Sequence, residues 1–245
     1  MLFEVFDIIL LTGMIVAVFA SGMTAYAGFG GALVLVPLFT LMIGPLQAIS
    51  LMAMVGTLSL VHVIPGLFKV IRWREVVPLV AGLLISISIS SSFLVRADAD
   101  FVRLCMGLFI LLAAAILILD FRYSGPRGTL PYFVVGVVTG IIMGGIGVPA
   151  GPVMVIYFLA APETPQVQRA NIMIAVWLLM LIMLVNLFGR DVIETSTLLR
   201  AAFIAPASLF GATLGQYLVK RAPVTWFKTF AHGLLIVIGV AMLAI

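Results

Sequence analysis

Two glycine-rich interruptions of apolar sequence are the features of this chain best suited to bind a ligand. The first lies at 28–31 and the second at 144–151. Glycine lets a ligand approach the backbone, and a helix that begins after such a break directs N–H groups and partial positive charge at it. We therefore expect an anion site whose candidate residues are Gly28, Gly30, Gly31, Gly145, Gly147 and Val148, with Gly30, Gly31, Gly147 and Val148 opening short helices. The alternative is that these glycines only permit close helix crossing.

Arg169 is the cation that best complements such a site. It lies between Gln168 and Asn171, at the start of a long apolar run. An arginine within a membrane is costly unless it is paired or faces a cavity, and its planar fork suits a trigonal oxyanion. The alternative is an anchor at the membrane surface. Gln168 is a further candidate beside Arg169, and helix position alone adds the candidate polar linings Gln47, Ser50, Thr57, Asn171 and Asn186.

His62 is the candidate proton relay, because imidazole titrates near neutral pH. The alternative for a lone histidine in an apolar block is a hydrogen bond to a neighbouring helix. A coupled proton is thus a candidate partner, whereas no cofactor and no metal site are expected. The single cysteine, Cys105, excludes an internal disulfide and a cysteine-rich metal site. The chain also lacks the glycine-rich lysine loop of nucleotide-binding proteins.

The composition places these residues in an all-α polytopic membrane protein. Of the 245 residues, 64% are hydrophobic and 9% are charged, whereas globular domains carry about 25% charge. Apolar blocks fill the chain, so no soluble domain is expected. We predict membrane segments at 8–27, 30–43, 46–67, 76–95, 101–119, 131–147, 150–161, 167–188, 198–219 and 226–245.

Two of these blocks are too short to span a bilayer fully. As helices, 30–43 and 150–161 would cover about 18–21 Å, which is less than a hydrocarbon core of about 30 Å. Both follow a glycine break, and they contain Pro37 and Pro152 respectively. We predict short broken or re-entrant helices at both places.

The chain divides into two homologous halves, 1–122 and 128–245, each with about four spanning helices and one short broken helix. Paired glycine-broken segments in matching positions are the best sequence pointer to a transporter's binding site. If each half crosses the membrane five times, most of the 13 lysines and arginines fall on the cytoplasmic side, as the positive-inside rule prefers. The sequence therefore favours an inverted repeat with both termini outside.

Small residues recur at every fourth position on two predicted helices. They are Gly82, Ser86 and Ser90 in the first half and Ala207, Gly211 and Gly215 in the second. In lipid, such stripes let helix backbones approach closely. We interpret them as helix-packing faces.

Together these residues resemble the TauE/SafE sulfite exporter family, also called the toluene-sulfonate uptake permease group. The resemblance rests on Gly-Phe-Gly-Gly at 28–31 followed by Val36-Pro37, the duplicated half, and the run 168–171 (Gln-Arg-Ala-Asn) after the second break. It covers nearly the whole chain. The second glycine run is shorter than the family's, and the first half has Ala-Ile-Ser at 48–50 in place of the polar run.

The resemblance implies a secondary transporter in the inner membrane. Its substrates would be small sulfur-containing anions of the sulfite, sulfonate and sulfoacetate type, moved by alternating access without a nucleotide. The lipid bilayer would be a partner, nucleic acid would not, and a homo-oligomer is left open. A scaffold or assembly protein and a transporter of an unrelated small anion remain alternatives. An enzyme is not expected: Ser59 and His62 lack the following glycine of an intramembrane serine protease, and paired membrane aspartates are missing.

Overall fold

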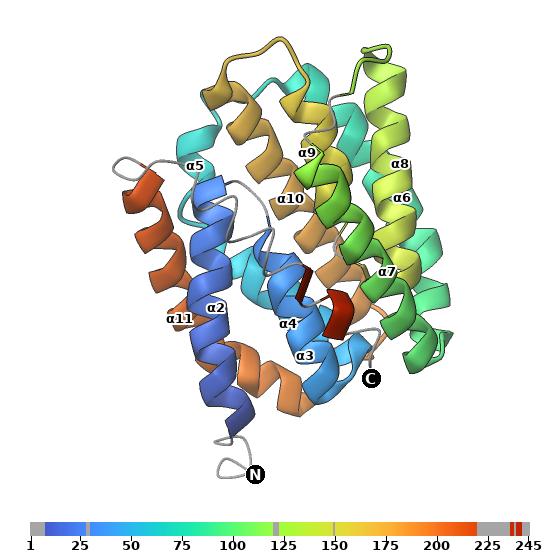
Figure 1. The fold of residues 1–245 in the computed structure, drawn as a ribbon, viewed down its shortest axis with the longest axis vertical. Coiled ribbons are helices and arrows are strands. Elements are labelled where there is room, and N and C mark those ends of the chain that lie inside the picture. Colours follow the sequence, from blue (N-terminus) through green and yellow to red (C-terminus); the bar gives the residue numbers. More distant parts are fainter. Residues whose placement is uncertain are drawn as a thin grey trace.

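A computed structural model describes residues 8–27, 30–119, 123–148, 150–219 and 236–241 with the exception of 238. Within these residues the regular secondary structure is helical (Figure 1). The order is α2 (Ile8–Ala27), α3 (Gly31–Ile43), α4 (Pro45–Leu60), α5 (Ile64–Leu67), α6 (Trp73–Arg96), α7 (Ala99–Ile118), α8 (Thr129–Ile146), α9 (Gly151–Leu159), α10 (Pro165–Phe188) and α11 (Thr195–Val219).

Five described helices, α6, α7, α8, α10 and α11, are long and apolar enough to cross a membrane. The all-helical membrane class predicted from composition is therefore confirmed. Prolines set two helix starts: Pro45 and Pro165 occupy the first turns of α4 and α10, where their missing N–H group is not needed. The block predicted at 46–67 divides into α4 and the short α5, and most of the block at 226–245 lies outside the described residues.

Both predicted breaks interrupt the helical path. Gly30, with φ of 102°, precedes α3, and Gly147, with φ of 66°, ends α8; this left-handed region favours glycine. One detail of the prediction was wrong, because Gly147 and Val148 do not open the second short helix. Instead the N–H group of Gly147 closes α8 on the carbonyl of Met143, and α9 begins at Gly151.

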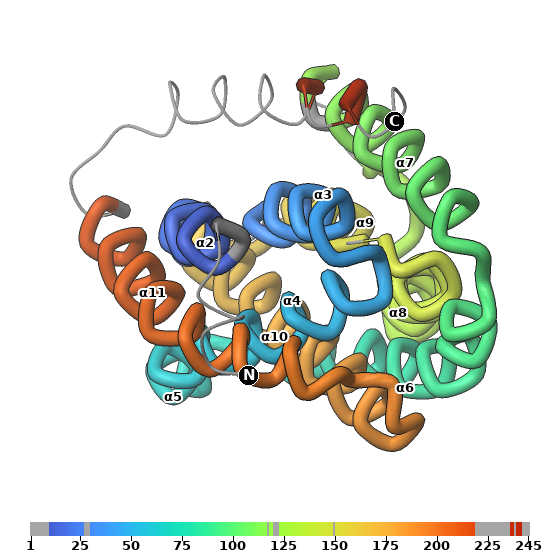
Figure 2. Tube along the Cα trace, turned by 90° about the horizontal axis from the view of Figure 1, so that it is seen from below, coloured from blue at the N-terminus to red at the C-terminus, as the bar shows by residue number. Residues whose placement is uncertain are grey.

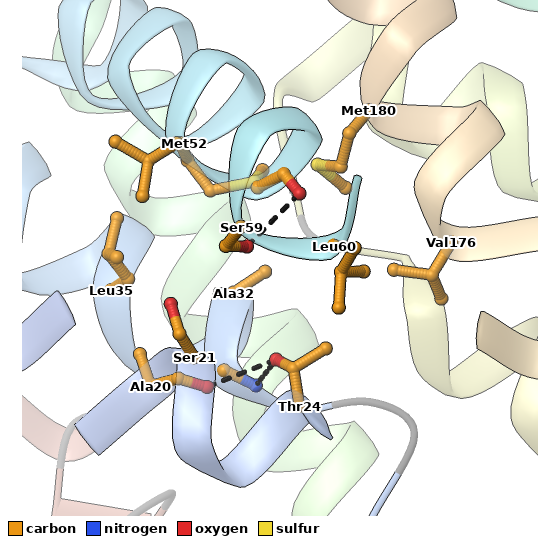
Figure 3. Close-up of a pocket in the computed structure, with 13 residues that line it drawn as sticks. Ala20, Ser21, Thr24, Ala32, Leu35, Met52, Ser59, Leu60, Val176 and Met180 are labelled. Atoms are coloured by element: carbon orange, nitrogen blue, oxygen red, sulfur yellow. Dashed lines mark hydrogen bonds between the residues drawn. The ribbon is translucent and has the colours of Figure 1, made fainter. Parts of the chain in front are cut away.

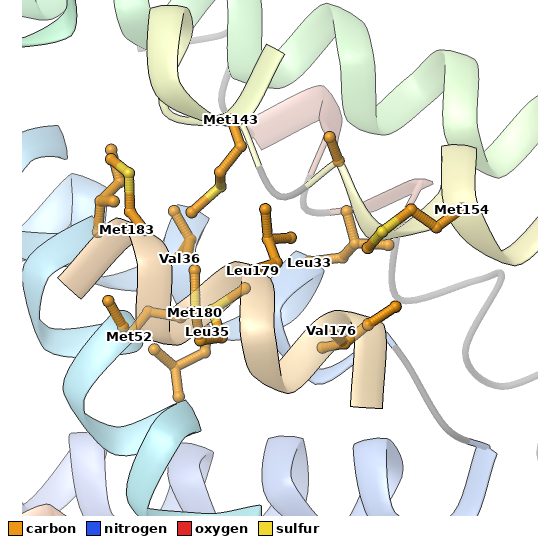
Figure 4. Packing of buried hydrophobic residues seen from close by; sticks show 14 of the residues in the cluster. Leu33, Leu35, Val36, Met52, Met143, Met154, Val176, Leu179, Met180 and Met183 are labelled. Carbon is orange, nitrogen blue, oxygen red and sulfur yellow. The ribbon is translucent and has the colours of Figure 1, made fainter. Parts of the chain in front are cut away.

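The two short helices are held by protein. At 13 and 9 residues, α3 and α9 extend about 20 Å and 14 Å. Val36 on α3 and Phe158 on α9 are fully buried. Around them lies a methionine-rich core to which α3, α4, α8, α9 and α10 contribute (Figure 4). Irregular backbone next to such helices is tolerated at membrane depth because protein surrounds it.

The long helices pack in a reciprocal way. The first helix of the predicted first half, α2, packs against α11, and the first helix of the second half, α8, packs against α6. Seen from below, these two pairs flank α3, α4 and α10 (Figure 2). Each pair therefore joins one predicted half to the other.

The small-residue stripes are what bring these pairs together, as predicted. A Cβ added to Gly136 would lie 2.0 Å from the carbonyl oxygen of Leu79, and one on Gly211 would lie 2.2 Å from that of Val18. The Ser90 hydroxyl donates a hydrogen bond to the carbonyl of Gly140 at 3.2 Å. Backbone is in contact with backbone at both interfaces.

Candidate functional site

Two small cavities flank the first turn of α3. The first has a volume of about 40 Å³ and lies between α2, α3, α4 and α10 (Figure 3). Its polar side chains are the hydroxyls of Ser21, Thr24 and Ser59. The rest of the lining is small or apolar, including Gly31 and Met180.

The second cavity, of about 30 Å³, lies where the two glycine breaks meet. Gly30 and Ala32 line it from the start of α3, and Gly151 and Pro152 line it from the start of α9. Thr24 lines both cavities. Because helix N-termini carry partial positive charge, the two short helices direct the same sign of potential at this space.

Thr24 fixes the geometry of the first break. Its hydroxyl accepts a hydrogen bond from the Gly31 N–H group at 3.1 Å and donates one to the carbonyl of Ala20 at 3.0 Å (Figure 3). A Cβ on Gly31 would lie 2.0 Å from the Ala20 oxygen and 2.3 Å from the Thr24 hydroxyl. Position 31 therefore has room only for glycine.

Both cavities are small, at about 40 and 30 Å³. A water molecule needs roughly 10–15 Å³ measured in this way, so each cavity holds only a few waters. An anion with several heavy atoms needs the cavities to widen or join.

Arg169 binds backbone at the break. Its Nη2 donates a hydrogen bond to the carbonyl oxygen of Ala25, in the last turn of α2. The neighbouring Gln168 does the same for α9, because its Nε2 donates to the carbonyls of Leu159 at 3.2 Å and Ala161 at 2.7 Å. Both side chains cap carbonyl groups at a helix end, and neither lines the two cavities.

Asn171 and Gln47 make matching links to the starts of two long helices, α6 and α11. The Asn171 Oδ1 accepts the Arg72 N–H group at 3.0 Å, just before α6, and its Nδ2 donates to Glu75 at 2.9 Å. The Gln47 Oε1 accepts the Thr197 hydroxyl at 2.8 Å, in the first turn of α11. Each amide thus joins a helix of one predicted half to a long helix of the other.

Among the described residues, the other predicted ones do not line the two cavities. The hydroxyls of Ser50 and Thr57 donate to carbonyls within α4, of Leu46 at 2.8 Å and Ala53 at 2.7 Å. His62 is exposed in the turn after α4 rather than inside a helix. Gly145, Gly147 and Val148 lie at or just after the end of α8. Gly28 lies outside the described residues.

Comparison with known families shows what kind of protein carries this geometry. The family model described as Sulfite exporter TauE/SafE matches residues 13–242. The chain belongs to the TauE/SafE sulfite exporter family. The match includes both glycine breaks, both cavities and the five long apolar helices. No curated protein and no solved structure matches the chain.

Membership of the TauE/SafE family makes the chain a multi-pass membrane protein of the anion-exporter type, a family of transporters. The sequence pointed to the two glycine breaks, but it did not single out Thr24, Ser21 and Gly151, which line the cavities there. A signal for Thr24 existed. Thr24 is a polar residue in the last turn of an apolar helix, directly before the break. It also shares one face of α2 with Ala20, four residues earlier.

Proposed function

We propose that this TauE/SafE member is a secondary transporter of small sulfur-containing anions, of the sulfite, sulfonate or sulfoacetate type, across the inner membrane. The substrate binds where the N-termini of α3 and α9 converge. The observation that carries this proposal is the shared lining of one cavity by Gly30 and Ala32 from α3 and by Gly151 and Pro152 from α9. Paired half-helix N-termini are a recurrent way to hold anionic substrates inside transporters.

The lining chemistry supports an anion. Among the described residues that line the two cavities there is no aspartate or glutamate. The Thr24 hydroxyl is the polar side chain common to both cavities. In surroundings this apolar, helix N-termini act with little screening, so a small oxyanion is favoured over a cation.

We further propose that the two halves form an inverted repeat that rocks around this site. In Figure 1, α2 runs from bottom to top and α8, its counterpart, from top to bottom. The exchange of packing partners between halves, α2 with α11 and α8 with α6, is what a two-fold axis in the membrane plane would produce. The Gln47 and Asn171 links follow the same exchange.

Alternating access is supported by a difference between the two ends of α6. Beyond its end, at Ala97, a cavity of about 260 Å³ is lined by Gly44, Gln47 and Glu194. Before its start, Arg72 forms an ion pair with Glu163 at 3.3 Å, and Asn171 links α10 to Arg72 and Glu75. In the proposed cycle, the protein opens at the start of α6, where these links break, and closes the cavity at the end of α6.

Counterflow in proteoliposomes tests the function. Liposomes containing the purified chain and unlabelled sulfite should accumulate labelled sulfite, and excess sulfonate or sulfoacetate should compete. A matched inorganic anion such as chloride should compete poorly. Repeating the assay with an imposed pH gradient tests proton coupling. If neither sulfite nor either sulfonate moves faster than in protein-free liposomes, the proposed substrate class is wrong.

A further inference from the structure

A second polar cluster lies on the connection between the two halves, outside the glycine-break site. The Arg127 guanidinium carbon lies 5.2 Å from the ring centre of Tyr157 on α9 and 6.0 Å from that of Tyr123. The Tyr157 ring also contacts Tyr132 on α8, edge to face, with ring centres 4.8 Å apart. The arginine is therefore held against aromatic faces, an arrangement that attracts a cation.

Two hydrogen-bond donors in this cluster have no acceptor. Arg127 Nη2 donates to the carbonyl of Tyr157 at 3.3 Å, but Arg127 Nη1 and the Tyr157 hydroxyl are buried without a hydrogen-bond partner. Tyr157 is only 2% exposed. None of the ion pairs between described residues includes Arg127. A buried donor without an acceptor is destabilising, and more so when it is charged, so a bound group that accepts from both donors would explain the arrangement.

We infer that Arg127 and Tyr157 form an oxyanion-binding site at the junction of the two halves, separate from the proposed transport site. The ligand is a sulfur or phosphorus oxyanion, which offers several acceptor oxygens to a guanidinium and a phenol at once. Arginine suits this class because its planar fork can bind two oxygens. The inference does not depend on the proposed transport function.

The hydroxyls of Tyr132 and Tyr157 have different surroundings in this cluster. The Tyr132 hydroxyl lies near the Glu75 carboxylate, which accepts a hydrogen bond from Asn171 at 2.9 Å. The Tyr157 hydroxyl is the one left to donate to a ligand. Because the Glu75 charge also acts on Tyr157, it opposes an oxyanion there, and its neutralisation should strengthen binding.

Two sources supply this chemistry. One is a free oxyanion such as sulfite or inorganic phosphate. The other is the phosphate of an anionic lipid headgroup, since basic pockets between membrane helices bind such groups. Both make the same contacts with Arg127 and Tyr157, so the experiment has one arm for each.

Thermal unfolding of the full chain, in a neutral detergent, tests the site. One arm adds sulfite or inorganic phosphate, and the other adds phosphatidylglycerol, with phosphatidylcholine as the neutral control. A ligand at one hundred times its dissociation constant raises stability by about 2.7 kcal/mol, a shift of several degrees. We expect Arg127→Gln and Tyr157→Phe to lose most of the shift, and Glu75→Gln to gain it at lower ligand concentration. Arg74→Gln is the matched control, because Arg74 is an exposed arginine near the same end of α6.

The two arms and the variants separate the outcomes. A shift with free anions identifies a soluble ligand, and a shift only with phosphatidylglycerol identifies a headgroup. Tyr157→Phe keeps the ring packing, so its unliganded unfolding temperature should stay at or above that of the wild type. The inference is overturned if no oxyanion, free or lipid, shifts the wild type, or if Arg127→Gln and Tyr157→Phe shift as fully as Arg74→Gln. If the wild type shows the ligand-induced rise in unfolding temperature but no sulfite counterflow, the result counts against the transport proposal alone.

Discussion

The guanidinium of Arg169, on α10, donates a hydrogen bond to the backbone carbonyl of Ala25, in the last turn of α2. The carbonyl end of a helix carries partial negative charge, and here it lies directly before the break that leads into α3. The cation offsets that charge close to the proposed anion site. Because Arg169 does not line the cavities, we propose that it acts on the site through the backbone, as a positioning residue.

Arg169→Ala should reduce both stability and sulfite flux. It removes a hydrogen bond from a charged donor, worth about 1.5–3 kcal/mol, and it restores the negative charge at the end of α2. Arg169→Lys keeps the charge, so it should retain more flux than the alanine variant although it loses the fork. Thermal unfolding and initial counterflow rates measure the two effects. If the wild type and both variants transport sulfite at equal rates, Arg169 does not contribute to transport and serves only as an anchor at the membrane surface.

Thr24→Val tests the hydroxyl shared by the two cavities. Valine keeps the shape but leaves the Gly31 N–H group without the acceptor it has at 3.1 Å, which costs about 1–3 kcal/mol. Thr24→Ser restores the acceptor and is the matched control. We expect lower flux and a lower unfolding temperature for valine, with serine close to wild type. If the serine variant is as impaired as the valine one, the hydroxyl is not what matters.

The breaks and the packing stripes could be predicted because glycine indicates where the backbone leaves the helical conformation or lies close to another backbone. Three glycines in the four residues from Gly28 to Gly31 favour an interruption of the helix, and small residues at four-residue spacing mark one helix face. Which glycine ends a helix and which one starts the next was not predictable. Gly147 and Gly151 are both compatible with either role, and only the left-handed backbone of Gly147 distinguishes them.

The partners of the polar side chains could not be predicted from spacing. Arg169 and Ala25 are separated by 144 residues, and Asn171 and Glu75 by 96. Both contacts follow from how α10 lies against α2 and α6, which local sequence does not state. An isolated arginine in an apolar run suggests a ligand contact. Here Arg169 instead donates to a carbonyl group in the last turn of α2, where carbonyl groups lack partners within the helix.

Gly136→Ala should destabilise the α6–α8 interface. The added methyl would lie 2.0 Å from the carbonyl of Leu79, so the helices must separate, and overpacking of this kind typically costs about 1–3 kcal/mol. Gly145→Ala, on the same helix, is the control, because its methyl would lie 3.7 Å from Ser90, an ordinary contact. Thermal unfolding should separate the two variants by several degrees. Equal unfolding temperatures would contradict backbone contact at this interface.

Reversing the Arg72–Glu163 ion pair tests the proposed closure at the start of α6. The two side chains are 59% and 22% exposed, so the pair is worth about 0–1 kcal/mol. Arg72→Glu and Glu163→Arg each place like charges together and should change the counterflow rate by up to about fivefold, in the same direction. The double variant should return towards the wild-type rate. Strictly additive effects in this cycle would show that the pair does not contribute to closure.

Gly151→Ala separates the effect of filling the second cavity from any effect on folding. A methyl group there meets no atom within 4 Å, and the backbone of Gly151 is not in the left-handed region, so the exchange should stabilise the fold by about 0.4–1 kcal/mol. Gly151 also lines the cavity of about 30 Å³, so we expect the added methyl group to reduce the space available there. We expect an unchanged or higher unfolding temperature together with at least a severalfold loss of sulfite counterflow. Gly66→Ala is the matched control, because its methyl also meets nothing within 4 Å but lies on α5, away from both cavities. Normal flux in a stable Gly151→Ala variant would show that the anion does not bind between α3 and α9.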